Sequence, residues 1–358
     1  MATDLLELSA SILDGAATID SHHPLRMSRQ STLQEVADRV AFVEAFANVV
    51  AIDTDDGLVL VDAAGPLHAG EVHEAIRAWS DRFLHTAVFT HGHVDHIYAV
   101  WYFEAEDGAP AARVIGHEAL PDRFRRYEMT NGYNAVINQR QFQLGAPIFP
   151  GDYRYPDETY RDQLDVTVGG VDLHLRHDRG ETDDGTWVWI EDHRIVCTGD
   201  LFIWASPNCG NPQKVQRYPA DWARAMRKMA DLRPELLLPG HGLPIAGAER
   251  VGTVLTETAE LLESLVEQTL SMMNEGARLD DIVHAVAPPA HLLDRPWLQP
   301  VYDEPEFVVH NLWRLYGGWY DGDPSHLKPA PAGDLARELA ALAGGASVLA
   351  ERAEALSD

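Results

Sequence analysis

The chain has 358 residues, of which 46% are hydrophobic, so it is long enough for one large domain with an appendage or for two domains. Asp and Glu number 56 against 28 Lys and Arg, which gives a formal charge of −28 at pH 7. So acidic a surface repels nucleic acid and anionic membranes, and neither is an expected partner. An anionic substrate would need a local cluster of cations in the protein.

Cysteine usage and the start of the chain give no sign of secretion. The two cysteines, Cys197 and Cys209, cannot form a disulfide framework and lie in no CxxC pair. The first residues, MATDLLELSASILDGA, carry neither the basic region nor the long apolar run of a signal peptide. No stretch approaches about 18 uninterrupted apolar residues, so no transmembrane helix is predicted. The expected location is therefore the cytoplasm.

The N-terminal part has the pattern of a layered α/β domain. Residues 1–36 are mixed and predict no definite element. From 40 to 63, β-rich runs are separated by Asn, Asp and Gly, and DDG at 55–57 predicts a hairpin turn. A helix over 68–79 and a short strand over 85–90 follow. Strands and helices in this order are typical of α/β folds.

Further strands and helices follow in the same style up to residue 247. The expected strands lie at 113–116, 165–178, 185–192, 193–200 and 235–240, and the expected helices at 117–129, 133–143 and 219–231. Beyond this point only helices are expected, at 247–275, 279–286, 304–321 and 332–355. We therefore predict an α/β domain over residues 1–247 and an all-helical region over residues 248–358.

A dense cluster of metal-ligand residue types follows a predicted buried strand. The strand runs into HGHVDH at 91–96, and imidazole and carboxylate groups at this density suit zinc or another divalent first-row metal. His91 and His93 flank a glycine on one loop, so both can reach one ion. Asp95 and His96 are adjacent and must diverge, which suits a second ion a few ångströms away. A histidine-rich surface loop is the alternative, and HxHxDH directly after a strand disfavours it.

Three further side chains at the ends of predicted strands are candidates for the remaining ligands. Glu181 lies in RGETDD, Asp200 in CTGD and His241 in LLLPGHG, each near a glycine. Loops at strand ends are where α/β proteins gather functional groups. Each residue alone is more often structural than a ligand. Together with the HxHxDH loop, they predict a metal centre built from several strand ends.

These motifs resemble those of the metallo-β-lactamase superfamily. HGHVDH at 91–96 is similar to its HxHxDH motif, TGD at 198–200 to the strand with the bridging aspartate, and PGHG at 239–242 to the loop with the last histidine. The resemblance implies that residues 1–247 form a catalytic αββα sandwich with a binuclear metal site. The commonest members carry a further histidine in a Gly-His-Thr motif, where this chain has a glutamate, Glu181.

The glutamate narrows the resemblance to the alkylsulfatase branch. TNGYNAVINQRQFQLG at 130–145 resembles the asparagine- and arginine-containing helix of that branch. The segment at 304–329, with GWYDGDPSHL, resembles the signature of the alkylsulfatase dimerisation domain, which implies a homodimer formed through residues 248–358. The segment at 202–219 departs from the histidine- and asparagine-containing stretch of that branch, so the class of ester stays open.

The resemblance implies a division of seven ligands between two ions. One ion would be held by His91, His93 and Glu181, and the other by Asp95, His96 and His241. Asp200 would bridge the two ions, and Asp95 and Asp200 are the expected catalytic carboxylates. A water between two divalent cations loses a proton near neutral pH and becomes a nucleophile. Zinc is the expected metal, while the carboxylate in place of an imidazole leaves manganese and iron open.

An anionic substrate would need cations near the metal ions. Arg140, Lys214 and Arg217 lie in segments expected near the mouth of the site, and an arginine can bind a sulfate or a carboxylate through two hydrogen bonds. Ordinary surface charges or internal ion pairs are the alternative for these three residues. Tyr133 and Asn138 are the expected polar contacts with the substrate.

The leading hypothesis is a metal-dependent hydrolase of an alkyl sulfate or a related small ester. Hydrolysis of a carboxylic ester, a thioester or a lactone is one alternative. A di-iron, oxygen-dependent oxidoreductase on the same fold is another, because glutamate at this ligand position also occurs in di-iron hydroxylases. A dimeric binding protein without catalysis is disfavoured, because a complete set of unused ligands carries a cost in buried charge.

Overall fold

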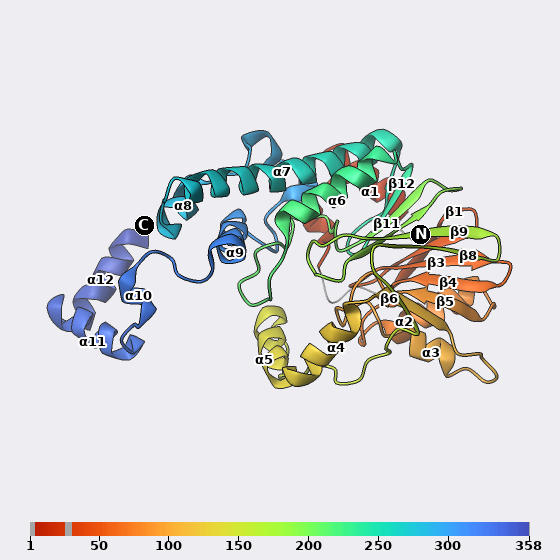
Figure 1. Ribbon diagram of the computed structural model, residues 1–358, viewed down its shortest axis with the longest axis horizontal. Coiled ribbons are helices and arrows are strands. Elements are labelled where there is room, and N and C mark those ends of the chain that lie inside the picture. Colours follow the sequence, from red (N-terminus) through yellow and green to blue (C-terminus); the bar gives the residue numbers. More distant parts are fainter. Residues whose placement is uncertain (1–3, 26–30, 358) are drawn as a thin grey trace.

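Two β-sheets packed face to face, with helices on both outer faces, form the body of the molecule (Figure 1). The computed structural model describes residues 4–25 and 31–357. One apolar core lies between the two sheets and continues beneath the helices that cover the second sheet, and another lies under the helices that cover the first. The αββα sandwich predicted from the sequence is confirmed.

The first sheet contains the β-rich N-terminal runs. Its seven strands, in spatial order, are β1 (Thr32–Ala37), β2 (Val40–Glu44), β3 (Val49–Thr54), β4 (Gly57–Val61), β5 (Leu84–Val88), β6 (Arg113–His117) and β7 (Glu158–Tyr160). Neighbours are antiparallel from β1 to β4 and parallel from β4 to β7. The predicted hairpin at 55–57 is confirmed, because Thr54 pairs with Gly57 across the turn.

Both faces of the first sheet are buried along the central strands β2 to β5, and the two-residue period of a strand separates the two faces. Phe42 and Ile52 belong to the core between the sheets, whereas their chain neighbours Ala41 and Ala51 belong to the core on the other face. That second core lies under α2 (Ala69–Trp79), α3 (Val100–Glu104) and α4 (Leu120–Met129). A sheet with two covered faces needs apolar side chains on both, which explains the near-continuous apolar runs in the sequence.

The second sheet has six strands. In spatial order they are β13 (Ile245–Ala246), β12 (Leu236–Pro239), β11 (Ile195–Gly199), β10 (Thr186–Ile190), β9 (Val171–His177) and β8 (Gln163–Val168). All neighbours are antiparallel except β11 and β12, which are parallel. The parallel pair sends two strand ends in the same direction, and both lead into the candidate site.

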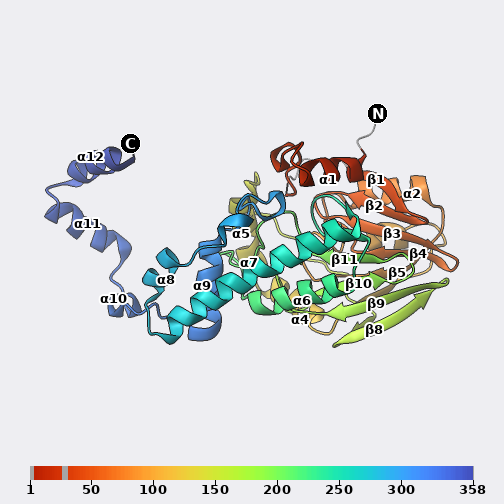
Figure 2. The ribbon, with the colours of Figure 1, turned by 90° about the horizontal axis from the view of Figure 1, so that it is seen from above.

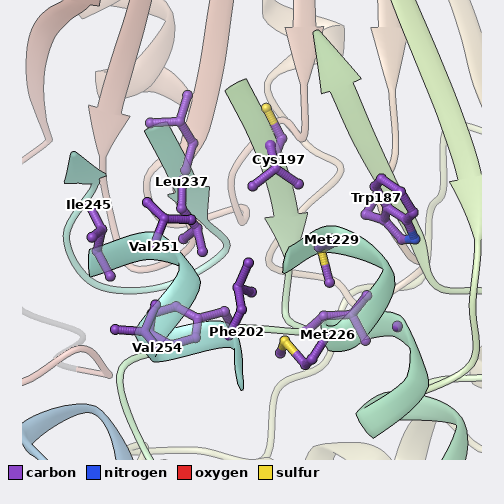
Figure 3. Close-up of a cluster of buried hydrophobic side chains, with 14 of the residues drawn as sticks. Trp187, Cys197, Phe202, Met226, Met229, Leu237, Ile245, Val251 and Val254 are labelled. Atoms are coloured by element: carbon purple, nitrogen blue, oxygen red, sulfur yellow. The ribbon is translucent and has the colours of Figure 1, made fainter. Parts of the chain in front are cut away.

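The outer face of the second sheet is covered by α6 (Pro219–Asp231) and α7 (Ala248–Asn274). Leu237 and Ile245 from the strands meet Met226 and Val251 from the two helices in this core (Figure 3). Cys197 lies in the same cluster, and burial raises the pKa of its thiol, so it is an unreactive core residue. This packing holds β11 and β12 firmly beneath the candidate site.

The C-terminal part is helical, as predicted. α7 begins directly after Gly247, the last residue of the predicted α/β domain, and packs along α6 (Figure 2). Beyond it lie α8 (Leu279–Ala285), α9 (Pro305–Gly317), α10 (Pro324–Leu327), α11 (Ala332–Leu342) and α12 (Ala346–Ser357). α8 and α9 pack on each other, and α9 packs on α7.

α11 and α12 extend away from the body, and no residue that the structure describes in them is buried (Figures 1 and 2). The division into two domains stays a prediction.

The ends of the chain differ in detail from the expectations. Residues 1–36 predicted no definite element, but they contain α1 (Leu5–Leu13), which is capped by the carboxylate of Asp4, and most of β1. The helical tail expected over 332–355 is divided at Gly344 and Gly345, whose φ angles of 93° and 126° favour glycine and end a helix.

In the part of the chain that the structure describes, no helix has the length and apolar character needed to cross a membrane.

Candidate metal centre

The predicted ligands lie just beyond the ends of strands in both sheets. β5 leads into the loop that carries His91, β11 is followed by Asp200, and β12 leads to His241. β11 and β12 are parallel neighbours, so Asp200 and His241 emerge side by side. Glu181 lies on the loop that joins β9 to β10. Four segments far apart in the sequence therefore meet at one place.

The seven side chains form two adjoining groups. The first contains His91, His93, Glu181 and Asp200, and the second contains Asp95, His96 and His241; within each group the ligand atoms lie within 4.8 Å of one another. Asp200 adjoins both groups. Its Oδ2 is 3.7 Å from His91 Nε2 and 3.4 Å from His241 Nε2, and its Oδ1 is 3.4 Å from His96 Nε2. All seven predicted ligands are thus brought together.

The donor set of this centre fits divalent cations. Among the described residues, His96 Nε2, Glu181 Oε2 and Asp200 Oδ1 are buried without a hydrogen-bond partner. A buried polar atom left unpaired costs about 1–3 kcal/mol, which a bound cation would offset. Burial and the charges of His96 and His93 lower the pKa of His91 to about 4, so its imidazole is neutral, the form that binds a metal.

Hydrogen bonds from the far side of each ring orient two of the imidazoles. His96 Nδ1 donates to Asp62 Oδ2 at 2.8 Å, and Thr90 Oγ1 donates to the same oxygen at 2.8 Å. His241 Nδ1 donates to the carbonyl oxygen of Phe46. These bonds leave each Nε2 directed at the centre, as in protein metal sites generally. Asp62 was not predicted as a site residue, although it directly follows the buried strand β4, which is the kind of position that marked the other ligands.

Glu181 is held by one of its two oxygens. Asn208 Nδ2 donates to Glu181 Oε1 at 2.7 Å, and Arg217 Nη1 donates to the same atom. Burial would raise the pKa of the Glu181 carboxyl, but the charges of Arg217 and His93 lower it to about 2. The second oxygen, Oε2, lies 3.2 Å from His93 Nδ1 and faces the centre. Arg217, which was expected to contact substrate, therefore lies buried against a candidate ligand.

A buried ion pair anchors the HxHxDH loop. The backbone N–H of Gly92 donates to Asp184 Oδ2 at 2.9 Å, and Arg123 Nε donates to Asp184 Oδ1 at 2.9 Å. A Cβ added at Gly92 would lie 2.8 Å from Arg123 Cδ, so the glycine allows this close approach. Neither Asp184 nor Arg123 was singled out from the sequence. They are far apart in the chain, and only the fold brings them together.

The centre opens into a cavity of about 430 Å³. His93, Asp95, Glu181, Asp200 and His241 lie in its wall. Much of the remaining wall is apolar, and this part includes Leu25, Phe46, Val94, Ile137, Phe142, Phe149, Ile203 and Val215. Its cationic side chains are Arg123, Arg126, Lys214, Arg217 and Arg314. The cavity thus offers a charged part and an apolar part to the same ligand.

The predicted substrate contacts occupy different positions around this cavity. Lys214, Arg217, Tyr133 and Asn138 line it. Burial and the charge of Arg217 lower the pKa of Lys214 to about 8. Arg140 is exposed, and its Nη1 donates at 3.1 Å to Gln213, which does line the cavity. Arg140 therefore reaches the cavity only through a neighbouring side chain.

The helical region also contributes to the cavity, which was not predicted. Tyr302 precedes α9, and its hydroxyl accepts a hydrogen bond from Gln141 Nε2 at 2.5 Å. Arg314 lies on α9, and its Nε donates at 3.0 Å to Gln216 Oε1. Both residues lie beyond the predicted boundary at 247, where no local motif marks them as part of a site. The cavity therefore needs both parts of the chain.

Comparison with known families identifies the class of protein. Residues 43–241 match the metallo-beta-lactamase superfamily, and residues 278–358 match the alkyl sulfatase dimerisation family. The first match covers more than half of the chain, so the protein belongs to the metallo-beta-lactamase superfamily. The predicted resemblance to the alkylsulfatase branch and its dimerisation domain is confirmed.

Two relatives from Pseudomonas sp. illustrate how far the similarity extends. A linear primary-alkylsulfatase is 28% identical over 319 residues, which cover 82% of this chain and 60% of that protein. An (R)-specific secondary-alkylsulfatase is 24% identical over 387 residues, which cover 96% of this chain and 57% of that protein. The chain thus spans about 60% of the length of the relatives that it matches.

Solved structures support the fold. The stereoselective inverting sec-alkylsulfatase Pisa1 from Pseudomonas sp. has a TM-score of 0.79 at 22% identity, over 91% of this chain and 56% of that one. A metallo-beta-lactamase family protein from Thermus thermophilus has a TM-score of 0.51 at 20% identity, over 80% and 94% of the two chains. At these identities the likeness concerns the fold alone.

Asp62→Asn tests the hydrogen bond that orients His96. Asparagine tolerates the positive φ of 62° at this position, but its neutral amide is a weaker acceptor for the imidazole N–H. We expect metal affinity to fall by about 10- to 100-fold, measured by competition with a chelator. The exposed Asp192→Asn should bind metal as the wild type does. Unchanged affinity in Asp62→Asn would contradict this role.

Gly240→Ala tests the close packing beneath Asp200. A Cβ at residue 240 would lie 2.1 Å from Asp200 Oδ1 and 2.8 Å from the carbonyl carbon of Gly199, so the carboxylate must move. We expect a loss of about 1–3 kcal/mol in the free energy of unfolding, together with weaker metal binding. The matched control is Gly252→Ala on α7, where the Cβ meets no atom within 4 Å. Equal stability and metal binding in the two variants would refute the packing argument.

Proposed function

We propose that this protein hydrolyses alkyl sulfate esters and depends on two divalent metal ions. The observation that carries the proposal is a centre of four imidazoles and three carboxylates that opens into a cavity with cationic and apolar walls. The names of the two Pseudomonas relatives, a linear primary-alkylsulfatase and an (R)-specific secondary-alkylsulfatase, support this class of substrate. Membership of the metallo-beta-lactamase superfamily supports the metal dependence.

In this proposal the seven side chains divide between two ions. One ion is held by His91, His93 and Glu181, and the other by Asp95, His96 and His241. Asp200 would contact both ions, because it lies 3.4–3.7 Å from imidazoles of the two groups. When bound, the ions supply the Lewis acidity that activates water as a nucleophile and stabilises negative charge on the departing group. Zinc is the proposed metal, and the Glu181 carboxylate also suits manganese or iron.

The cavity matches both parts of an alkyl sulfate. Apolar side chains such as Phe46, Ile137 and Phe149 would cover the hydrocarbon chain, because burial of apolar surface is favourable. Lys214 provides a positive charge in the same cavity for the sulfate group. Tyr133 and Asn138, which line the cavity, would contact the substrate, and Arg140 would act through Gln213. Arg217 supports Glu181 and adds positive charge beside it.

The proposed activity is tested on the full chain, purified without added metal. Metal content is measured by plasma mass spectrometry, and hydrolysis is measured with alkyl sulfates and carboxylic esters of matched chain length. We expect about two zinc or manganese ions per chain and release of inorganic sulfate. Glu181→Ala should lose metal and at least about 100-fold in turnover, because a ligand is removed.

The control is Glu191→Ala, a glutamate whose side chain is 72% exposed in the turn after β10, and it should keep full activity. Two iron ions with oxygen uptake and no hydrolysis of any ester would instead favour an oxidoreductase on this fold. Turnover of carboxylic esters without turnover of sulfates would overturn the substrate class but keep the hydrolase.

We also propose that the protein is a homodimer that forms through its helical C-terminal region. Residues 278–358 match the alkyl sulfatase dimerisation family. Leu335, Leu339 and Leu342 lie on one face of α11 and are 54%, 52% and 84% exposed, and Trp319 nearby in sequence is 71% exposed. Apolar surface of this kind, on helices that extend from the body, is typical of an interface between subunits.

Light scattering after size-exclusion chromatography tests the dimer. We expect twice the chain mass of 39.7 kDa for the wild type at micromolar concentration. The double variant Leu335→Glu/Leu339→Glu should shift the protein toward the monomer, because two charges would be buried without partners. Arg337→Glu, on the opposite face of α11, should remain dimeric. A wild-type protein of monomer mass would refute the proposal.

A further inference from the structure

Among the cations of the cavity, some already have acidic partners. Arg123 pairs with Asp184, and Arg217 pairs with Glu181. The charges of these two arginines are therefore largely compensated inside the protein. Arg314 differs, because among the residues that the structure describes its guanidinium donates only to neutral partners, the side-chain oxygens of Gln216 and Asn311.

In the described part of the chain, two further cations of the cavity wall have neither an acidic partner nor a neutral hydrogen-bonding partner. Among the described residues, the charged groups of Arg126 and Lys214 form no hydrogen bond or ion pair, although the chain carries a formal charge of −28. The Arg126 guanidinium lies over the ring of Tyr127, 5.2 Å from its centroid. A half-buried cation without a counter-ion raises the free energy of the protein in a low dielectric. An anion bound beside Arg126 and Lys214 would therefore be stabilised by their charges.

Arg126 and Lys214 come from different elements and both line the cavity. Arg126 lies on α4, and Lys214 lies on the segment that joins Asp200 to α6. Burial and Arg217 are the main causes that lower the pKa of Lys214, and the charge of Arg126 also contributes. The carboxylates of Glu181 and Asp95 act on Lys214 in the opposite direction. The two cations thus line the same cavity as Glu181 and Asp95, and their charges act on each other.

We propose that Arg126, together with Lys214, forms a clamp for the sulfate group and selects anionic over neutral esters. This inference rests on the proposed function and adds a residue that was not predicted from the sequence. A sulfate monoester carries one negative charge that is shared by three terminal oxygens. The planar guanidinium of Arg126 can donate two parallel hydrogen bonds to two of them, and the Lys214 ammonium can donate to the third. A neutral ester offers no charge to this pair, so it gains much less.

The adjacent residue on α4 provides a matched control. Arg125 is exposed, forms an ion pair with Asp122 one turn away, and is not part of the cavity wall. Arg126→Gln and Arg125→Gln therefore remove the same charge from neighbouring positions of one helix. Only the first removes it from the cavity. Arg126→Lys keeps the charge but loses the paired donors of the guanidinium.

Binding is measured on the metal-loaded full chain by isothermal titration calorimetry with octanesulfonate and with octanol. Octanesulfonate presents a sulfonate anion on a carbon–sulfur bond that cannot be hydrolysed as an ester, and octanol has the same chain without the charge. We expect Arg126→Gln to weaken octanesulfonate binding at least about tenfold and to leave octanol binding unchanged. Arg126→Lys should fall between the wild type and Arg126→Gln, and Arg125→Gln should bind as the wild type does.

Several outcomes would overturn the clamp. In the first, Arg126→Gln binds octanesulfonate with the affinity of the wild type. In the second, Arg126→Gln loses as much affinity for octanol as for octanesulfonate. In the third, the wild type does not bind octanesulfonate. A failure of the proposed function looks different, because the wild type would bind octanesulfonate in an Arg126-dependent manner yet hydrolyse no sulfate ester. If sulfates are hydrolysed, Arg126→Gln should raise KM more than it lowers kcat, as expected for a binding residue.

Discussion

Three carboxylates, those of Asp95, Glu181 and Asp200, meet four imidazoles in a largely buried space, and their charge must be balanced there. Like charges at such distances repel strongly in a low dielectric. Arg217 balances part of this charge by donating to one oxygen of Glu181. The unpaired atoms that remain, such as Asp200 Oδ1, leave room for cations to balance the rest. The contacts that surround these seven side chains serve to hold the charges in place and to compensate them.

The fold holds these groups through backbone features at strand ends. Asp200 and His241 come from two parallel strands that are packed against α6 and α7, so their separation is set by the sheet. Gly240 makes room for the Asp200 carboxylate, because any larger residue would place a Cβ 2.1 Å from Oδ1. Asp62, with a positive φ at the end of β4, turns its carboxylate toward His96. Packed strands thus present the candidate ligands, while loops and α9 shape the cavity.

The sequence allowed the seven clustered side chains and most strands to be predicted, because those signals are local. HxHxDH is a contiguous motif, and Glu181, Asp200 and His241 each lie near a glycine beyond an apolar run. The supporting contacts have no such signal: Arg123 and Asp184 are 61 residues apart, and Asn208 reaches Glu181 from 27 residues away. The cationic substrate contacts were predicted only from the segments in which they lie. The exposed position of Arg140 could not be foreseen, because it depends on tertiary packing. The same holds for the helical region, whose contribution to the cavity wall arises only after folding.

The central claim, that this centre holds two metal ions, is tested most directly by anomalous X-ray diffraction from crystals of the metal-loaded protein at the absorption edge of the bound metal. The account predicts two anomalous peaks per chain. One should lie among His91, His93 and Glu181, the other among Asp95, His96 and His241, with Asp200 adjacent to both. A single peak, or no peak within this group of side chains, would contradict the account.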